Sequence, residues 1–300
     1  MTERFFCATA ARLRGDALAG TAAPARRWLL VEYSGAWARL ALQSHGLAGP
    51  VGQALHDAAV AVGGRVLLIR RPGRRPRRTV QAWGVVDHDD GQAWGHWRSP
   101  EDLFAAAAAM RLGPLDAPTG LRPADAPLFL VCAHGLHDVC CAVRGRPVAA
   151  ALAQRWPDQA WECSHVGGDR FAPSLVVVPD GTFYGVLGPS SVAAVVEGHL
   201  AGRVDPTHFR GQSTQPPLVQ AATAAALQRY DPVGPRDVVG ATVVRVGTET
   251  WEVELHGRGA LPPMVRASVL RSRGAAAQLT CRGRGDDTAY EYVVSDLREG

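Results

Sequence analysis

Two apolar runs along the chain have the same form, and each ends in a turn at a glycine. One covers residues 28–35 and ends at Gly35; the other covers residues 128–135 and ends at Gly135. A continuous apolar run that is bounded by a turn residue is typical of a buried strand. We therefore interpret each run as the first strand of a unit that occurs twice.

Each half of this repeat also contains one predicted hairpin. Asp90-Gly91 stands between apolar strands in the first half, and Asp180-Gly181 does so in the second half. Asp-Gly between apolar segments is a strong hairpin signal, because type I′ turns require positive φ at both central positions. The two hairpins strengthen the case for an internal repeat.

Helical segments fill the remaining positions in both halves. Both halves then have the order strand, helix, strand, strand, strand, helix, which predicts a mixed sheet with helices packed on it. This order matches the core of a thioredoxin-like domain. The predicted helices cover residues 51–62, 101–110, 147–156 and 190–200, with Pro147 at the first position of its helix.

Pro- and Gly-rich stretches divide the chain into three parts. We predict an α/β protein with tandem thioredoxin-like domains at 1–115 and 124–204, followed by a small α+β unit at 215–300. The third unit opens with an alanine-rich amphipathic helix at 219–230 and continues with alternating strands. Because we find no cluster of reactive residues there, we interpret it as a structural or partner-binding module.

The composition is that of a globular protein of the cytoplasm. The chain has 300 residues, of which 47% are hydrophobic and 20% are charged. No apolar run approaches the roughly 18 residues that a membrane helix needs, and the first residues lack the layout of a secretory signal. The net charge of +4 is small for this length, so neither a nucleic-acid partner nor a membrane partner is expected.

Basic residues are concentrated in one segment. Six arginines fall within residues 70–78. A solvated loop is the ordinary interpretation of such a charge cluster. The alternative is a docking patch for an acidic redox partner, because complementary charge mainly speeds the encounter of two proteins.

Cysteines and histidines are clustered in the middle third. Six cysteines in a cytoplasmic chain do not suggest a disulfide framework, because that compartment keeps thiols reduced. Cys7 and Cys281 are isolated in the sequence. The other four share one window with three histidines, which indicates a metal or redox site; these residues are Cys132, Cys140, Cys141, Cys163, His134, His137 and His165.

The repeat provides an internal control for this site. Glu32 stands where the second half has Cys132, and the arginine segment lies near the position of residues 165–169. Only the second half can therefore hold a metal through these positions. We interpret the first half as a degenerate scaffold copy that packs against the second.

Three motifs of the second half resemble the sucrase/ferredoxin-like family. They are CAHGLHDVCC at 132–141, GRP at 145–147 and WECSHVGGDRFA at 161–172. The amino-terminal segment at 7–22 is similar to the same family, so the resemblance covers roughly residues 5–200. Long motifs of this kind are more specific than a short pattern.

The resemblance implies a thioredoxin-like ferredoxin, an electron carrier with a [2Fe–2S] cluster held by two cysteines and two histidines. The family's cysteine pair corresponds to Cys132 and Cys141, and the first residue of its His-x-x-x-His segment corresponds to His165. Asp169 stands where the second histidine is expected. A carboxylate is a hard anion that lowers the reduction potential relative to neutral histidine. Asp169 is the predicted fourth ligand, with Cys163 as its substitute.

The cysteines and histidines of this window are also compatible with two other functions. A structural zinc site would use Cys132, Cys141, Cys163 and His165 as a closed Cys3His set, although without the usual short-pair spacing. A thiol-disulfide oxidoreductase would use Cys140 or Cys141, although without a Cys-x-x-Cys motif.

Other activities are not favoured. No acidic pair suitable for sucrose hydrolysis stands out, so an electron carrier is favoured over an enzyme. His134 and His137 are interpreted as hydrogen-bonding or solvated residues, because histidines in surface loops more often have that role than a ligand role.

Overall fold

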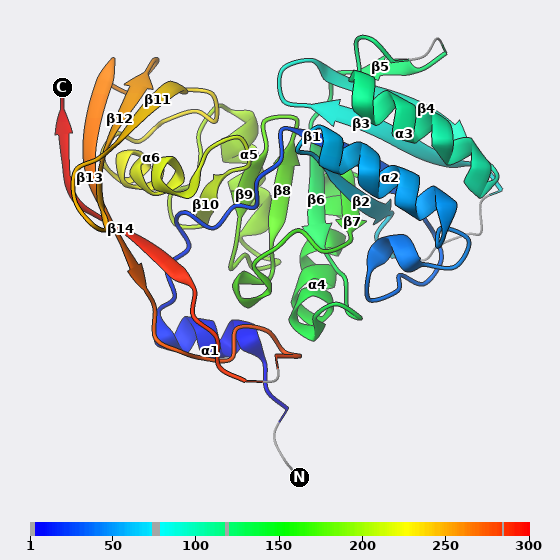
Figure 1. Cartoon of the computed structure of the whole chain (residues 1–300), viewed down its shortest axis with the longest axis horizontal. Coiled ribbons are helices and arrows are strands. Elements are labelled where there is room, and N and C mark those ends of the chain that lie inside the picture. The colour runs from blue at the N-terminus through cyan, green and yellow to red at the C-terminus, as the bar shows by residue number, and fades with distance from the viewer. Residues whose placement is uncertain (1–3, 74–78, 118–119, 284) are drawn as a thin grey trace.

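The computed structural model describes residues 4–73, 79–117, 120–283 and 285–300. Residues 74–78 of the arginine cluster lie outside the described residues. The described part of the chain forms one ten-stranded sheet, a second sheet of four strands and the helices that cover them (Figure 1). No helix in these ranges is both long and apolar enough to cross a membrane.

The strands of the large sheet come from both predicted halves. They are β1 (Arg27–Glu32), β2 (Arg65–Arg70), β3 (Gln81–Asp87), β4 (Gly91–Trp97), β5 (Arg122–Ala124), β6 (Leu128–Cys132), β7 (Ala160–Cys163), β8 (Leu175–Val178), β9 (Thr182–Tyr184) and β10 (Phe209–Gln212). Their order in the sheet is β10-β9-β8-β6-β7-β2-β1-β3-β4-β5.

The helices lie before, between and after these strands in the sequence. They are α1 (Cys7–Arg14), α2 (Pro50–Ala61), α3 (Leu103–Leu112), α4 (Val139–Arg155), α5 (Val192–Leu200) and α6 (Pro217–Arg229), with short 3-10 helices η1 (Ala41–Gln43), η2 (Pro100–Asp102) and η3 (Asp169–Phe171). The predicted order of elements is confirmed in both halves. It is β1, α2, β2, β3, β4, α3 in the first half and β6, α4, β7, β8, β9, α5 in the second.

Both predicted hairpins are present, as the antiparallel pairs β3–β4 and β8–β9. Their loops are longer than the two-residue type I′ turn that the Asp-Gly signal suggested. In both loops the glycine has a positive φ, 78° at Gly91 and 73° at Gly181, which is the conformation that glycine adopts at no steric cost.

The two halves share a continuous sheet. Strands β2 and β7 pair in antiparallel fashion, so that Ile69 lies opposite Cys163 and Arg70 opposite Glu162. At this seam Arg70 Nε donates to Glu162 Oε2 over 2.9 Å, and both side chains are buried. The strand orders β2-β1-β3-β4 and β7-β6-β8-β9 correspond to each other. Two separate thioredoxin-like domains stay a prediction, because the sheet continues across their junction.

Alternate residues of the strands face two different cores, as the period of a strand requires. Leu29 and Val31 of β1 pack with α2 and α3, whereas Phe129 and Val131 of β6 pack with α4 and α5. The residues between them, including Leu30 and Leu130, join one core that both halves share. The amino-terminal segment covers part of that shared core through Cys7, Ala8, Ala22 and Ala25.

The C-terminal part combines α6 with the four-stranded sheet. Its strands β11 (Val238–Arg245), β12 (Thr250–Gly257), β13 (Met264–Arg273) and β14 (Tyr290–Glu299) pair in sequence order, each antiparallel to the next. Buried residues of α6 and of this sheet belong to the same core as α4 and α5. The unit is therefore packed onto the second half, at the opposite end of the molecule from α2 and α3 (Figure 1).

The prediction for the third helix was wrong at its beginning. Helix α4 starts at Val139, and Pro147 lies inside it. Asp138 caps the helix, because its side chain accepts a hydrogen bond from Cys140 N over 2.8 Å. Pro147 has no backbone N–H, so it cannot donate to the carbonyl of Val143. The side chain of Val143 is exposed, so this turn of the helix lies at the surface. The earlier start places both cysteines of the Cys-Cys pair in the first turn of α4.

Candidate metal centre

The four predicted ligands lie at one edge of the large sheet. Cys132 is the last residue of β6, and Cys141 lies in the first turn of α4. His165 and Asp169 follow β7, which runs parallel to β6. Because parallel strands end at the same edge of a sheet, this topology brings the four residues together.

Asp169 is at the centre of this group. Cys141 Sγ donates to Asp169 Oδ1 over 3.2 Å, and His165 Nδ1 lies 2.9 Å from the same oxygen. The side chain of Asp169 is 5% exposed and that of His165 is 26% exposed. A thiol and an imidazole therefore converge on one buried carboxylate, with one side of the imidazole open to solvent.

The pKa shifts at this site favour a negative Cys132 and Asp169 and a positive His165. The thiol of Cys141 hydrogen-bonds Cys132 and lowers the pKa of Cys132 to about 5, although burial acts in the opposite direction. Burial alone would lower the pKa of His165, but Asp169 and Cys132 outweigh it and raise the pKa to about 9. Burial would raise the pKa of Asp169, but His165, Cys141 and His137 outweigh it and lower the pKa. The site thus provides a thiolate and a carboxylate that suit a metal cation.

One nitrogen of His165 lacks an aligned hydrogen bond. Its contact with Asp169 is not aligned as a hydrogen bond, so the buried Nδ1 has no hydrogen-bond partner among the described residues. Buried polar atoms are normally paired in a native structure. An imidazole nitrogen that contacts a carboxylate without an aligned hydrogen bond, and that lies beside a thiolate, fits a metal-binding role.

A glycine turn connects His165 to Asp169 and makes room for a buried arginine. Gly168 has a φ of 73°, and a Cβ at this position would lie 2.1 Å from Arg210 Nη2. Arg210 is fully buried and donates to Gly167 O and to Ser174 Oγ, each over 3.1 Å. It places a positive charge behind the ligand group. The sequence contained no signal for this role, because Arg210 is a single arginine outside every motif.

The two loop histidines have different surroundings. His134 Nε2 donates to Ala38 O over 2.7 Å, and its Nδ1 accepts from His165 N over 3.3 Å, so it has the hydrogen-bonding role that we expected. His137 stacks on His165 with 3.7 Å between ring centres, and its Nε2 lies 3.6 Å from Asp169 Oδ2. The sequence interpretation therefore undervalued His137, which borders the candidate ligands directly.

Cys163 lies further inside the protein. It pairs with Cys132 across β6 and β7 and with Ile69 across the seam, and it is fully buried. Burial raises the pKa of its thiol well above the ordinary value. The described residues form two groups whose ligand atoms all lie within 4.8 Å of one another, and neither group includes Cys132, Cys141 or Cys163. The Cys3His zinc set is thus not gathered around one point.

Cys7 and Cys281, which are isolated in the sequence, meet in the structure. Cys281 Sγ lies 3.3 Å from Cys140 Sγ and 3.5 Å from Cys7 Sγ. Cys140 is therefore engaged with these two cysteines, whereas Cys141 turns to Asp169. The buried position of Cys140 also gives little support to a thiol-disulfide oxidoreductase, whose attacking thiol must be accessible.

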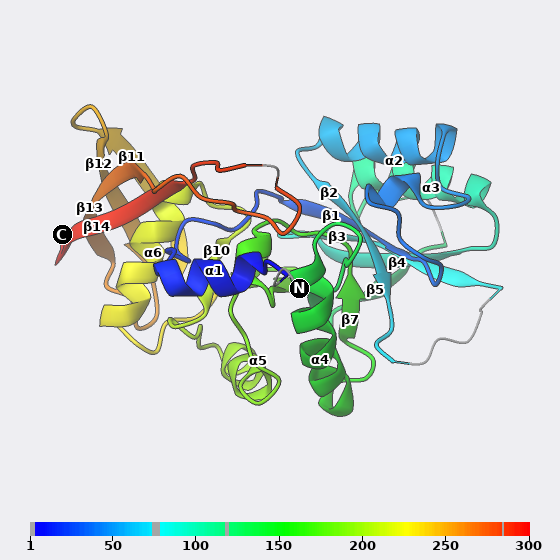
Figure 2. The same ribbon diagram turned by 90° about the horizontal axis from the view of Figure 1, so that it is seen from below.

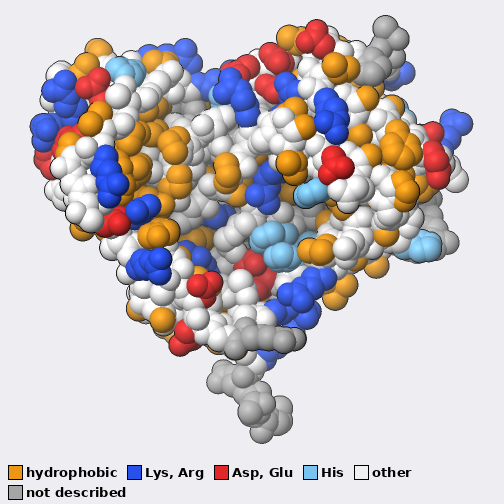
Figure 3. All heavy atoms as spheres, in the orientation of Figure 1, with side chains coloured by type: hydrophobic (Ala, Val, Ile, Leu, Met, Phe, Trp, Pro, Cys, Tyr) orange, Lys and Arg blue, Asp and Glu red, His pale blue; other side chains and the backbone are white. Residues whose placement is uncertain are grey.

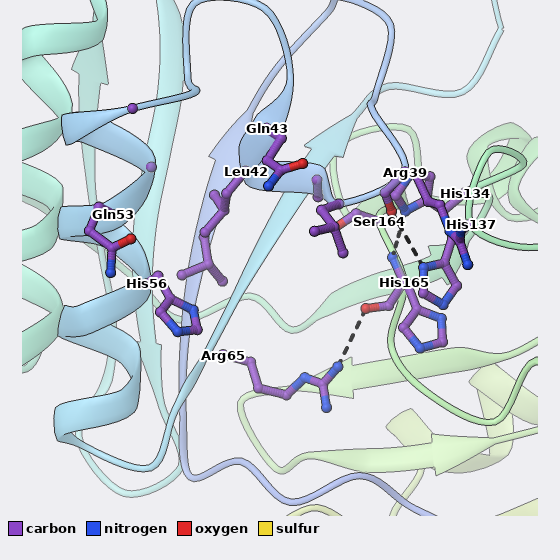
Figure 4. A pocket seen from close by; sticks show the side chains of 15 residues that line it. Arg39, Leu42, Gln43, Gln53, His56, Arg65, His134, His137, Ser164 and His165 are labelled. Carbon is purple, nitrogen blue, oxygen red and sulfur yellow. Dashed lines mark hydrogen bonds between the residues drawn. The ribbon is translucent and has the colours of Figure 1, made fainter.

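A cavity opens beside the candidate ligands. Its volume is about 570 Å³, and it is lined by residues of the first half together with His134, His137 and His165 (Figure 4). Arg65 Nη2 donates to His165 O over 3.4 Å at its wall. In the space-filling view, histidines gather in a hollow near the middle of the face shown (Figure 3). The imidazole of His165 is therefore reachable from outside.

Comparison with known proteins gives a family match over most of the chain. The model of the sucrase/ferredoxin-like family matches residues 18–211. No curated protein matches the chain significantly. Among solved structures, the thioredoxin-like [2Fe–2S] ferredoxin from Aquifex aeolicus is 23% identical, with 31% of this chain and 97% of that chain covered and a TM-score of 0.27. A cysteine-to-serine variant of that ferredoxin is 21% identical, with 29% and 100% covered and a TM-score of 0.26.

Proposed function

Because this chain belongs to the sucrase/ferredoxin-like family, we propose that it is an electron-transfer protein with a [2Fe–2S] cluster on Cys132, Cys141, His165 and Asp169. The observation that carries the proposal is the convergence of Cys141 and His165 on Asp169 at the edge where β6 and β7 end. Cys132, which ends β6, adds the second sulfur ligand.

The donor set suits iron rather than a hard cation. Thiolates favour iron–sulfur clusters, and an imidazole nitrogen is also a good ligand for iron. A cluster spreads its ligands over two irons, so the four donor atoms need not lie as close together as around one ion. When bound, a [2Fe–2S] cluster supplies one-electron redox chemistry. Asp169 in place of a neutral histidine adds negative charge, which favours a lower reduction potential.

The surroundings of His165 support a role in contact with other molecules. Its ring borders the cavity, so it can exchange a proton with water there. The other three proposed ligands are buried and protected from solvent. His165 is thus the proposed point of closest approach for an electron donor or acceptor.

An acidic redox protein is the proposed partner. Arg39 lines the cavity beside His165, and Arg146 lines a neighbouring hollow with His134; both arginines are exposed. Figure 3 shows basic side chains around the hollow that contains the histidines. Positive charge around the reachable ligand would attract and orient an acidic surface.

The proposal is tested on protein purified without oxygen. We expect a red-brown protein with two irons and two sulfides per chain, and an electron paramagnetic resonance signal after reduction. Cys132→Ser and Cys141→Ser should each lose most of the iron, whereas Cys163→Ser should retain it and serves as the matched buried control. Protein that remains colourless and iron-free after cluster reconstitution would contradict the proposal.

A further inference from the structure

A second group of ligand-type side chains lies next to the proposed cluster. It consists of Cys7, Asp138, Cys140 and Cys281, whose ligand atoms all lie within 4.8 Å of one another. The four residues come from three distant parts of the chain: the first residue of α1, the beginning of α4, and the loop between β13 and β14. Figures 1 and 2 show this loop running from the C-terminal sheet to the region of α1.

We propose that Cys7, Cys140, Cys281 and Asp138 bind a single zinc ion. The spacing of their ligand atoms is the first argument. Four ligands that lie about 2.3 Å from a tetrahedral ion are about 3.8 Å from one another. Cys140 Sγ and Cys281 Sγ are 3.3 Å apart, and Cys281 Sγ and Cys7 Sγ are 3.5 Å apart. Cys7 Sγ lies 3.7 Å from both carboxylate oxygens of Asp138.

The kind of donor is the second argument. Three sulfurs and one oxygen form a soft donor set, which suits zinc and excludes magnesium or calcium as the preferred ion. All four ligands are contributed by the protein, as in a structural zinc site. The compact arrangement favours one ion, because the ligands of a two-iron cluster are shared between two metal atoms.

Backbone donors around the group are the third argument. Asp138 accepts hydrogen bonds from Cys140 N over 2.8 Å and from Cys281 N over 2.7 Å. Cys7 N donates to Cys281 Sγ over 3.3 Å. Outer contacts of this kind orient metal ligands and offset their negative charge. Each oxygen of Asp138 retains a lone pair after its backbone contact, so the carboxylate can still bind the ion.

The beginnings of two helices also face these sulfurs. Cys7 is the first residue of α1, and Cys140 is the second residue of α4. The amino terminus of a helix carries partial positive charge, which stabilises a thiolate placed there. Three thiolates and a carboxylate exceed the charge of a zinc ion, so these helix termini compensate part of the excess.

The position of the group gives the ion a structural role. Cys7 and Cys281 are separated by 274 positions in the sequence, and Cys7 and Asp138 by 131. An ion that binds all of them links the amino-terminal helix and the C-terminal unit to the beginning of α4. Ligands that close such long loops restrict the unfolded chain strongly. Cys281 is half-buried, which leaves a route for the ion from solvent.

The test uses full-length Cys132→Ser protein, which removes a proposed cluster ligand and leaves this group intact. The protein is reduced, stripped of metal and titrated with Co²⁺, and Zn²⁺ is then added in competition. We expect one high-affinity Co²⁺ per chain with a sulfur-to-cobalt charge-transfer band, displaced by one Zn²⁺. Adding Cys281→Ser should weaken zinc binding at least about 100-fold, since even outer contacts of a metal site are worth 10- to 100-fold.

Cys163→Ser in the same background is the matched control and should leave the titration unchanged. Circular dichroism checks that the Cys281→Ser protein is folded. Because Cys281 lies in a half-buried loop, alkylation of the protein without this change provides a second readout: zinc should slow modification of Cys7, Cys140 and Cys281 together. Absence of stoichiometric binding, or binding that Cys281→Ser leaves unchanged, would overturn the proposal. Because the Cys132→Ser background already lacks a proposed cluster ligand, the titration reports on the zinc site alone and does not depend on whether the unsubstituted protein holds iron.

Discussion

Cys140 and Cys141 are neighbours in the sequence, yet their sulfurs face different groups. Cys140 Sγ lies 3.3 Å from Cys281 Sγ, while Cys141 Sγ donates to Asp169 Oδ1 over 3.2 Å. The first turn of α4 causes this divergence, because consecutive helical residues point in directions about 100° apart. A pair that is ambiguous in the sequence is thus divided between two sites.

This division predicts opposite effects of the same substitution. Cys141→Ser should remove most of the iron from protein purified without oxygen, because it deletes a thiolate at the proposed cluster. Cys140→Ser should retain the iron and lose the zinc. Metal analysis of both variants checks the prediction. Equal loss of iron from the two variants would show that the cysteines do not serve separate sites.

Asp169 offers a prediction about the reduction potential. Asp169→His replaces a negative ligand by a neutral one and should raise the potential by on the order of 100 mV, in the direction seen when histidine replaces anionic ligands. A redox titration at several pH values measures this. The new imidazole should also make the reduction potential depend on pH, because its second nitrogen can release a proton when the protein is oxidised. Asp169→Glu is the control, since it keeps the charge. A potential that is the same in both variants would exclude residue 169 as a ligand.

Much of the fold could be predicted because its signals are local. The apolar runs at 28–35 and 128–135 became β1 and β6, and each Asp-Gly pair became a hairpin loop. Glu32 is the last residue of β1, as Cys132 is the last residue of β6. The Glu32 side chain accepts a hydrogen bond from Ala82 N over 2.9 Å. The repeat was visible because strand and turn patterns depend on neighbouring residues.

The rest depended on contacts between distant residues. Cys7 and Cys281 carry no mark in the sequence that they meet, since only the path of the loop before β14 brings them together. His137 was interpreted as a loop residue, because its stacking on His165 requires the positions of two loops. The start of α4 is a different case. Aspartate is a favoured helix cap, so Asp138 was a local signal for a helix that begins at Val139, but our prediction started the helix at Pro147 instead.

A buried carboxylate in the second half predicts how stability depends on pH. His199 Nε2 lies 2.9 Å from Asp180 Oδ2, and Tyr184 OH lies 2.9 Å from His199 Nδ1. Burial would raise the pKa of Asp180, but His199 and Thr182 outweigh it and lower the pKa below the usual 3.8. The unfolded chain therefore binds the proton more readily, so this contribution to stability is present above about pH 4 and is lost as the pH falls through the lower folded value.

Denaturant unfolding at neutral and acidic pH measures this contribution. Asp180→Asn should lower the free energy of unfolding by about 3 kcal/mol at pH 7, because one of the two buried oxygens becomes an NH2 group that cannot accept the hydrogen bonds of Thr182 or His199. The difference from the unsubstituted protein should shrink below pH 4. The exposed Asp158→Asn is the matched control and should change stability by no more than about 0.5 kcal/mol. An Asp180→Asn effect that stays constant down to pH 3 would contradict this account.

The proposed docking of an acidic partner predicts a rate effect that depends on salt. Arg146 is exposed and lines the hollow next to His134, whereas Arg273 is exposed at the end of β13 and lines neither this hollow nor the cavity beside His165. Arg146→Glu and Arg273→Glu change the net charge equally, so only their positions differ. Arg146→Glu should slow electron transfer to an acidic ferredoxin-type protein at low ionic strength by roughly 10-fold, because steering by local charge changes association rates by 10-fold or more. The difference should disappear in about 0.5 M salt, where the Debye length is only a few ångströms. Equal slowing by both substitutions would mean that net charge matters and that this face is not the docking surface.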